Sequence, residues 1–259
     1  MINTRYKVQG VVLLTGILLL GIFLYSRDKV LMPIKCSNEL WGYIKLDGQV
    51  AIPPQFNFAY SFMGDLATVK LGDRWGFINH SGTIMVPAQF DDALPFTNGF
   101  AAVQVGRRWG FIDNSGNIVI NPQFDAAWYF QDGFASVRVG NRWGFIDKSG
   151  KMVISPQFDD ASNFSEGFAS VRVGNRWGFI DKSGKMVISP QFDDASRVKE
   201  SFASVRVGNH WGFIDKSGKM VISPQFDDAW NFTHGFARVR LGQRWGFINK
   251  LGKLFFPNC

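Results

Sequence analysis

A Trp-Gly pair followed by an aromatic residue recurs along this chain at one fixed interval. The seven tryptophans lie 34 residues apart, with no insertion or deletion between them: Trp41, Trp75, Trp109, Trp143, Trp177, Trp211 and Trp245. A period this strict indicates one small supersecondary unit copied in tandem, so one repeat predicts the structure of all the others. It also means that residues repeated for packing look the same as residues repeated for binding.

One repeat reads as a small antiparallel meander. In the central copy, alternating apolar and polar residues over 135–139, 142–147 and 151–154 are typical of three short strands. Gly140-Asn141 suits a two-residue hairpin turn, and 148–150 suits a three-residue loop that ends in a left-handed glycine. With the first turn of two residues, Arg138 is predicted to lie opposite Trp143, and Val137 opposite Gly144.

This pairing makes both faces of each sheet apolar. Ala135, Val137 and Ile146 fall on one face, and Trp143 and Phe145 on the other. A sheet that is apolar on two sides must be covered on two sides, and the preceding and following copies are the natural covers. We therefore expect the tryptophans and their glycines to form the packing joint between repeats.

The connection between copies begins with Pro-Gln-Phe-Asp-Asp. We expect one helical turn here, capped by Asp159 or Asp160 and ended by Gly167. Phe158, Phe164 and Phe168 are expected to hold this connection against the meander.

The full motif resembles a known family. Gly-Asn-Arg-Trp-Gly-Phe-Ile-Asp-Lys-Ser-Gly, the Pro-Gln-Phe-Asp block and the Gly-Phe-Ala strand recur in register, as in the WG repeat family, over about residues 37–259. The resemblance implies a β-rich repeat, mostly bacterial, that acts by binding. The first and last copies depart from the pattern, with Tyr43 in place of Phe and Leu-Phe-Phe-Pro at 254–257, as is typical of capping repeats.

Residues 35–259 are thus expected to be an all-β body of seven three-stranded meanders. We expect an open β-solenoid-like stack, because 34 residues is short beside the roughly 40 to 50 of common four-stranded propeller blades. A closed propeller-like toroid is the alternative. Cys36 and Cys259 bracket the body, and a disulfide between them would favour the ring and an oxidising compartment. The other possibility is two unrelated thiols, and the two interpretations predict different shapes.

Residues 1–34 have a different character. Val11–Tyr25 is uncharged and apolar, and the segment extends back to Val8. Leu24, Tyr25 and Ser26 match a signal-peptidase site poorly, so we expect one N-terminal apolar helix, an uncleaved signal anchor that enters the membrane through residues 8–25. The alternative is a cleaved signal peptide and a secreted protein. The basic residues ahead of the segment place the N-terminus in the cytoplasm and the repeats outside.

The net charge of +7 belongs largely to this segment. Residues 1–35 carry +4, which leaves only +3 on the repeats. A topogenic signal explains that distribution better than phosphate contacts do, so nucleic-acid binding is not expected.

Repetition also creates two ladders of basic residues. One immediately precedes the tryptophans, and the other lies on the preceding strand, cross-strand from them. Their stems could simply cover the indoles, or the ladders could form a basic, aromatic stripe for an anionic polymer or a partner protein. The candidate stripe consists of Arg138, Arg142, Arg172, Arg176, Arg206, Arg240 and Arg244.

The connecting loops vary between otherwise near-identical copies. Asn-Phe-Ser-Glu-Gly at 163–167 becomes Arg-Val-Lys-Glu-Ser at 197–201 and Asn-Phe-Thr-His-Gly at 231–235. A binding rim would vary in this way, and so would an exposed loop that drifts.

Catalytic and metal-binding patterns are absent from the sequence. The aspartate before each Lys-Ser-Gly turn suits turn formation better than calcium binding, and none of His80, His210 and His234 stands at ligand spacing. We therefore expect no cofactor, no metal and no enzymatic activity. The leading hypothesis is a membrane-anchored, extracytoplasmic binding or scaffolding protein that engages an envelope protein or a glycan. The alternatives are a purely structural spacer and, after it, an enzyme of unrecognised type.

Overall fold

The computed structural model describes residues 30–256 of the chain. The expected N-terminal helix, its membrane segment at 8–25 and Cys259 lie outside these residues. Within 30–256 there is no helix, and thus none that could cross a lipid bilayer. Cys36, partly exposed, follows the first strand; its pairing with Cys259 stays a prediction.

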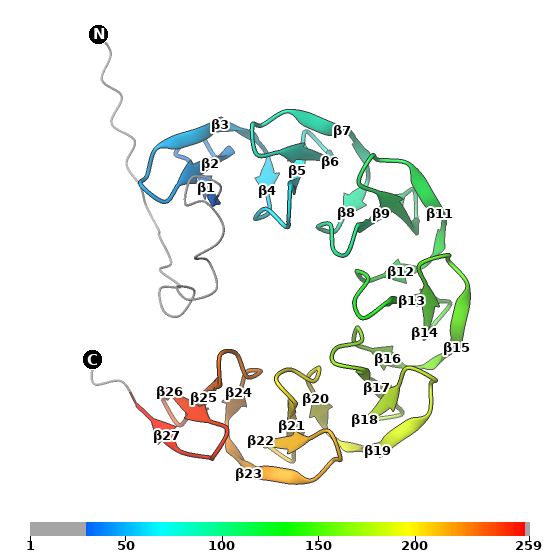
Figure 1. The fold of residues 1–259 in the computed structure, drawn as a ribbon, viewed down its shortest axis with the longest axis vertical. Coiled ribbons are helices and arrows are strands. Elements are labelled where there is room, and N and C mark those ends of the chain that lie inside the picture. Colours follow the sequence, from blue (N-terminus) through cyan, green and yellow to red (C-terminus); the bar gives the residue numbers. More distant parts are fainter. Residues whose placement is uncertain (1–29, 257–259) are drawn as a thin grey trace. The chain divides into compact units, whose positions relative to one another are not determined.

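The described residues form seven antiparallel sheets that follow one another along the chain (Figure 1). The chain divides into two compact units, Met1–Gln123 and Phe124–Cys259. Each unit is built from sheets of the same design.

Three sheets belong mainly to the first unit. The first sheet contains β1 (Leu31–Lys35), β2 (Trp41–Lys45) and β3 (Val50–Phe56); the second contains β4 (Phe58–Ala59), β5 (Leu66–Leu71), β6 (Arg74–Asn79) and β7 (Ile84–Phe90); the third contains β8 (Asp92–Ala93), β9 (Phe100–Val105), β10 (Arg108–Asp113) and β11 (Ile118–Phe124).

Four sheets make up the second unit. The fourth contains β12 (Ala126–Ala127), β13 (Phe134–Val139), β14 (Arg142–Asp147) and β15 (Met152–Phe158); the fifth contains β16 (Asp160–Ala161), β17 (Phe168–Val173), β18 (Arg176–Asp181) and β19 (Met186–Phe192); the sixth contains β20 (Asp194–Ala195), β21 (Phe202–Val207), β22 (His210–Asp215) and β23 (Met220–Phe226); the seventh contains β24 (Asp228–Ala229), β25 (Phe236–Leu241), β26 (Arg244–Asn249) and β27 (Leu254–Phe255).

The expected three-stranded meander is wrong for six of these seven sheets, because the connection adds a fourth strand. The expected helical turn is a two-residue strand, β16, that pairs Asp160 with Arg172 and Ala161 with Val171. Asp159 holds it there: its N–H donates to the carbonyl of Arg172, and its Oδ2 accepts from the N–H of Gly174 at 2.7 Å. Thirty-four residues accommodate four strands because one of them is only two residues long.

The central hairpin has the predicted register. Arg138 pairs with Trp143 and Val137 with Gly144 across β13 and β14. Gly140 has a φ of 61°, whereas Asn141 keeps a negative φ, so only the first turn residue needs the left-handed region. This combination is typical of a type II′ hairpin turn.

The glycine after each tryptophan serves its own sheet rather than the neighbouring copy. β14 and β15 shift register on either side of Phe145, and this irregularity brings β15 against Gly144. A Cβ on Gly144 would lie 2.5 Å from the carbonyl oxygen of Ile154 and 2.8 Å from the nitrogen of Pro156. The expected joint between repeats therefore involves the tryptophans but not their glycines.

Successive sheets within each unit pack face to face, as the two apolar faces predict. One core joins the fourth and fifth sheets, where the rings of Phe145 and Phe164 lie 4.8 Å apart between centroids. Trp143 belongs to that core and is only 9% exposed. Similar cores join the first to the second sheet, the second to the third, the fifth to the sixth and the sixth to the seventh.

The first sheet begins earlier than expected. β1 starts at Leu31, four residues before the expected start of the repeat body at residue 35, and Leu31 is buried. Its sequence, Leu-Met-Pro-Ile-Lys, shares little with the Phe-Ala-Ser-Val-Arg strand of the other copies, yet it takes the same place beside β2.

Candidate binding site

In several copies the arginine before the tryptophan belongs to a link between successive sheets. Arg142 Nη1 donates to Asp159 Oδ1 at 2.5 Å, and Asp159 also accepts from Gly174 in the hairpin turn of the next sheet. Arg176 and Arg74 repeat this arrangement with Asp193 and Asp91. These guanidinium groups are half exposed, and their charge is already opposed by a carboxylate. Arg244 instead lies over the ring of Phe256, at 4.4 Å.

The arginines on the preceding strand lie over the tryptophans. Arg138, Arg206 and Arg240 are each 5.9 to 6.0 Å from the centroid of their cross-strand indole. This separation is at the outer limit of a cation–π contact. Arg172 instead donates to the carbonyl of Gly174 and lies 3.9 Å from Asp160. Each arginine of the candidate stripe thus contacts a carboxylate, an aromatic ring or, as Arg206 does, both.

Two tryptophans outside the repeated pair are among the most exposed aromatic residues. Trp128 and Trp230 directly follow the short strands β12 and β24, at the same place in their copies, and are 44% and 50% exposed. Neither was singled out from the sequence, although the composition contains the signal: the chain has nine tryptophans, and the Trp-Gly pairs account for seven.

Each of these exposed rings lies beside a tryptophan of the repeated pair. Trp128 stacks on Trp143, with 6.5 Å between centroids and 13° between planes. Trp230 lies 6.0 Å from Trp245, and the guanidinium of Arg238 is 4.9 Å from the first ring and 4.2 Å from the second. The other copies of the second unit have serine at the position of Arg238, so this cation–aromatic cluster is particular to the seventh sheet.

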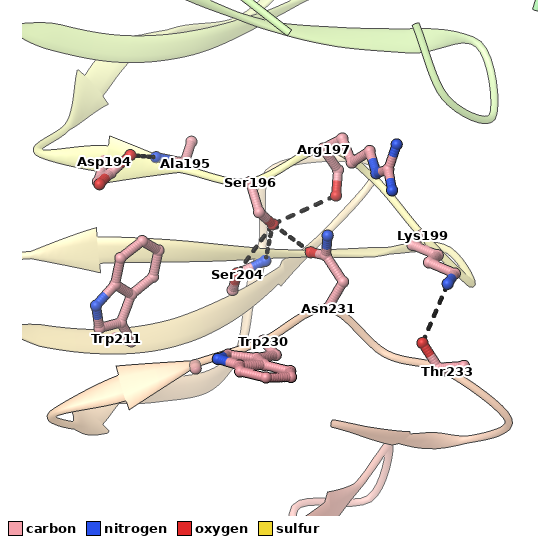
Figure 2. Close-up of a pocket in the computed structure, with 11 residues that line it drawn as sticks. Asp194, Ala195, Ser196, Arg197, Lys199, Ser204, Trp211, Trp230, Asn231 and Thr233 are labelled. Carbon is pink, nitrogen blue, oxygen red and sulfur yellow. Dashed lines mark hydrogen bonds between the residues drawn. The ribbon is translucent and has the colours of Figure 1, made fainter. Parts of the chain in front are cut away.

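A pocket of about 510 Å³ opens between the sixth and seventh sheets. Figure 2 shows Trp211 and the Lys199–Thr233 pair at opposite ends of it, with Trp230 and Asn231 between them. Trp211 comes from β22 of the sixth sheet, and Trp230 from the segment that follows β24 of the seventh. Two indoles from successive sheets therefore line one pocket.

A hydrogen-bonded network forms the polar part of this pocket. Ser196 Oγ accepts from the N–H and hydroxyl of Ser204, at 3.0 and 2.9 Å, and donates to Asn231 Oδ1. Lys199 Nζ donates to Thr233 Oγ1 at 3.1 Å (Figure 2). These hydrogen bonds hold several of the lining residues to one another.

The charge of the pocket is positive. Arg197 and Lys199 are the basic residues of the lining, although the guanidinium of Arg197 is directed away from both indoles (Figure 2). Asp194, the acidic residue of the lining, lies 4.0 Å from Arg206 outside it. Arg197 Nη1 also donates to the hydroxyl of Tyr129, at 2.7 Å. The lining thus contains more basic than acidic residues, which favours an anionic ligand.

This pocket is where the variable loops contribute side chains. Arg197 and Lys199 come from the loop 197–201, and Asn231 and Thr233 from the loop 231–235. The equivalent residues of the preceding copy are Asn163 and Ser165, both buried. The pocket therefore combines cations found in the sixth sheet with an exposed tryptophan found in the seventh.

The same loops also contain a structural chain of carboxylates. Glu166 accepts from the N–H groups of Glu200 and Ser201, and Glu200 in turn accepts from those of His234 and Gly235. Burial alone would raise the pKa of Glu200, but the N–H of Gly235 and the ammonium of Lys250 outweigh it and hold that pKa below its usual value. Part of each loop is therefore fixed by the loop before it.

The repeated aspartates form turns. Asp147 Oδ1 accepts from the N–H and hydroxyl of Ser149 and from the N–H of Lys151. The hydroxyl of Ser149, ahead of the backbone donors, lowers the pKa of this carboxyl. Across residues 30–256, no three His, Cys, Asp or Glu side chains gather as a metal site would require.

A second pocket, of about 490 Å³, has a related lining in the first unit. Phe58, Tyr60, Lys70 and Trp75 contribute to it, and Tyr60 stacks on Trp75 with 5.7 Å between centroids. Tyr60 directly follows the short strand β4, so it occupies the repeat position of Trp128 and Trp230.

The comparisons with known proteins establish the family. The model of the WG containing repeat matches six successive segments, 41–75, 75–108, 109–143, 143–177, 177–209 and 211–245. The chain belongs to the WG repeat family. The resemblance expected from the Trp-Gly motif is thereby confirmed. A search of curated proteins finds no match to this WG repeat chain.

Solved structures resemble this WG repeat protein in fold alone. A eukaryotic initiation factor aligns with a TM-score of 0.60 and 12% identity, over 88% of this chain and 74% of that one. The dihydro-heme d1 dehydrogenase NirN, in complex with DHE, aligns at 0.56 and 11%, over 90% and 64%. Hsv2 of Kluyveromyces lactis aligns at 0.54 and 9%, over 86% and 90%. These folds are propeller-like, in keeping with four-stranded sheets in series.

Proposed function

We propose that this WG repeat protein is an extracytoplasmic binding protein, anchored to the cytoplasmic membrane, whose pocket between the sixth and seventh sheets holds an acidic glycan. The observation that supports this most is Trp230, half exposed in a pocket that Trp211, Arg197 and Lys199 also line. An indole left in water at the mouth of a preformed pocket is a common feature of binding sites.

The lining suits the chemistry of an acidic sugar. The C–H face of a pyranose ring stacks on an indole such as Trp230, and its hydroxyls pair with groups such as Asn231 and Thr233. A carboxylate or sulfate on the sugar pairs with Arg197 or Lys199. The volume of about 510 Å³ lies within the usual range of small-molecule sites. An envelope protein is the less favoured occupant, because a protein segment normally needs a larger surface.

The test is binding of the full chain, in detergent, to oligosaccharides of uronic acid and to neutral oligosaccharides of equal length, by isothermal titration calorimetry. We expect the acidic series to bind more tightly and its affinity to fall with added salt. Trp230→Ala should weaken binding about tenfold, as the loss of a stacked aromatic typically does. Trp128→Ala is the matched control, since it removes an equally exposed indole at the same repeat position outside the pocket.

Charge and stacking can be separated by a second pair of variants. Arg197→Gln and Lys199→Gln should weaken binding of the acidic oligosaccharides and leave the weak binding of the neutral ones unchanged. Equal affinity of Trp230→Ala and the parent chain for every oligosaccharide would reject the pocket. A chain that binds neither series would favour the competing proposal, a spacer without a ligand.

The anchor and orientation belong to the same proposal. The apolar segment at 8–25, preceded by Arg5 and Lys7, supports a single-pass anchor with the repeats outside the cytoplasm. A reporter active only outside the cytoplasm, fused after Cys259, should be active. An inactive fusion, together with activity of a cytoplasm-only reporter at the same position, would contradict this orientation. A shortened N-terminus in mature protein would favour the secreted alternative.

We also propose that the seven sheets form an open stack. The departures of the first and last copies from the repeated motif, Tyr43 and Leu-Phe-Phe-Pro at 254–257, support this, since capping repeats are typical of an open array. The state of Cys36 and Cys259 in protein purified without reductant tests it. Free thiols are expected from the stack, and a disulfide would favour the closed ring.

A further inference from the structure

The second sheet departs from the repeated motif where its short strand begins. Asn57 and Phe58 stand where four other copies have two aspartates in succession, as at 159–160. Asn57 keeps the structural contact of the first aspartate, because its Oδ1 accepts from the N–H of Gly72 in the hairpin turn at 2.7 Å. The second sheet therefore keeps the turn contact of its neighbours while it lacks two of their negative charges.

Phe58 joins three other rings in an aromatic cluster of the first unit. Its centroid lies 5.0 Å from that of Trp41, 5.1 Å from that of Tyr60 and 5.8 Å from that of Trp75. Tyr60 also stacks on Trp75, with 30° between the planes. Tyr60 is 36% exposed, and Phe58 and Trp75 are partly exposed. Aromatic rings left partly in water around a pocket are typical of a binding site.

The polar groups of this pocket carry balanced charges. Asn57, Lys70 and Asp73 line it together with three of the rings. Lys70 lies opposite Phe58 in the strand pairing, where the fifth and sixth sheets place an arginine opposite an aspartate. Asp73 stands in the hairpin turn, where three other copies have asparagine. One cation, one carboxylate and one amide thus border the aromatic surface, in contrast to the basic pocket between the sixth and seventh sheets.

These groups set the chemistry of the ligand. The carboxylate of Asp73 can only accept hydrogen bonds, and the ammonium of Lys70 can only donate them. A ligand that satisfies both needs donors and acceptors beside an apolar face, and the hydroxyls and C–H face of a neutral sugar provide them. A proline-rich peptide also docks on aromatic rings, but its prolines have no N–H to donate to Asp73.

We propose that this pocket of the first unit is a second binding site, for a neutral sugar residue. The C–H face of one pyranose ring stacks on Tyr60, and its hydroxyls donate to Asp73 and accept from Lys70 and from the amide of Asn57. The volume of about 490 Å³ lies within the usual range of small-molecule sites. The site differs from the proposed acidic-glycan pocket in place and in ligand, and it does not depend on that pocket.

Isothermal titration calorimetry of the full chain tests this site, in a detergent without a sugar headgroup. The probes are the hexasaccharides of glucose, of N-acetylglucosamine and of a uronic acid. We expect at least one of the two neutral hexasaccharides to bind with an affinity that does not change with added salt, because the ligand carries no charge. Trp230→Ala, which removes an indole from the other pocket, should leave that affinity unchanged.

Variants that copy other repeats test the aromatic surface with little risk to the fold. Tyr60→Ser installs the residue found at Ser162 and should weaken binding of the neutral hexasaccharide about tenfold, as the loss of a stacked aromatic typically does. Tyr60→Trp installs the residue found at Trp128 and should bind at least as tightly as the parent chain. Trp128→Ser is the matched control, since it makes the reverse change at the same repeat position outside the pocket, and should leave neutral binding unchanged.

The polar groups are tested by the same approach. Asp73→Asn installs the residue found at Asn141 and should weaken neutral binding, because an amide replaces the carboxylate that accepts from the hydroxyls. Phe58→Asp gives Lys70 a partner of the kind that the equivalent arginines have, and should weaken neutral binding by removing one ring and occupying the cation.

Failure of both neutral hexasaccharides to bind would overturn the proposal, as would equal affinity of Tyr60→Ser and the parent chain. Weakening by Tyr60→Trp as large as that by Tyr60→Ser would also overturn it, since a larger ring should preserve stacking. A proline-rich decapeptide that binds the parent chain but not Tyr60→Ser, in the absence of sugar binding, would favour a peptide site instead. The acidic-glycan pocket is judged separately, because Tyr60→Ser should leave binding of the uronic acid hexasaccharide unchanged whereas Trp230→Ala should weaken it.

Discussion

At the scale of residues, most of the repeated charges have structural partners. Arg142, Asp159 and Gly174 link one sheet to the next, and the triad recurs with Arg176, Asp193 and Gly208. A pattern of regularly spaced arginines therefore does not by itself indicate a binding stripe. One aspartate per repeat can form an ion pair with each arginine.

His210 interrupts this series of links and allows a direct measurement of one. It stands where the neighbouring copies have arginine, and Asp227 there retains its bond from the N–H of Gly242. His210→Arg should restore the ion pair and stabilise the chain by about 0.5 kcal/mol, the usual size for a half-exposed pair. Urea denaturation measures the change. His210→Gln, which supplies no permanent charge, should leave stability unchanged, and an equal gain in both variants would contradict the ion-pair explanation.

Carboxylates in the turns and loops predict loss of stability in acid. Hydrogen bonds lower the pKa of Asp147, Asp181 and Asp215, and, against the opposing effect of burial, those of Glu166 and Glu200. The unfolded chain then binds protons more readily than the folded one, so stability is complete above the ordinary carboxyl pKa values and falls as pH drops through the lowered ones.

We therefore expect the free energy of unfolding to be constant from about pH 7 to 5 and to fall below about pH 4. Urea titrations at several pH values measure it. Glu200→Gln should lower stability by about 1 kcal/mol at pH 7 and less at pH 3, where the carboxylate is partly protonated. Glu39→Gln, which removes an exposed carboxylate near the start of the body, is the control and should have little effect at either pH. A uniform effect of Glu200→Gln at all pH values would contradict this account.

At the scale of elements, the sequence predicts the central hairpin well and the connection poorly. The two-residue turn at Gly140 fixes the register of β13 and β14, so one local feature determines six residue pairs. The strand β16 has only two residues, too few for an alternating pattern, and Asp159 positions it through bonds to residues 13 and 15 places further along. Such long-range hydrogen bonds exist only in the folded sheet, so the local sequence does not predict them.

The glycine of the Trp-Gly pair predicts that a substitution there strongly lowers the stability of its sheet. Gly144→Ala would place a methyl group 2.5 Å from the carbonyl oxygen of Ile154, and backbone cannot move aside as a side chain can. We expect a loss of about 3 kcal/mol, the upper range for overpacking. Chemical denaturation should show a lower midpoint for Gly144→Ala. Lys151→Ala in the same sheet is the control, and two similar midpoints would refute the close-approach explanation.

The candidate site was predicted only in part for a related reason. Sequence reasoning singled out the variable loops, and Arg197, Lys199 and Thr233 do line the pocket. Trp230 was not predicted, because a tryptophan that does not recur in every copy leaves no periodic signal in the sequence. Bringing Trp211 and Trp230 together requires the packing of one sheet on the next, which no local pattern describes.

At the scale of the whole molecule, stability is a sum of sheets and joints. In the second unit the fifth and sixth sheets are covered on both faces, whereas the last sheet leaves Phe236, Phe247 and Phe255 partly exposed. In repeat proteins of this kind, the terminal units open most readily.

Hydrogen exchange measured by mass spectrometry tests this expectation. Amides of β26 should exchange faster than those of β18, although Arg-Trp-Gly-Phe-Ile is identical in both strands. The identical sequence serves as the internal control, because intrinsic exchange rates are then nearly equal. Equal protection of the two strands under conditions that keep the chain monomeric would show that the last sheet is stabilised by something other than its joint with the sixth.

The chain of carboxylates between loops has one more consequence, for how such a gene can change in length. Glu166 binds the loop at Glu200, and Glu200 binds the loop at His234 by the same pair of bonds. A deletion of 34 residues, from Gly167 to Glu200, would leave Glu166 followed by Ser201 and bring its carboxylate to the loop at His234. Recombination between near-identical copies can therefore shorten or lengthen this protein by whole sheets. The loop that follows the junction still finds a glutamate carboxylate that accepts from its two N–H groups.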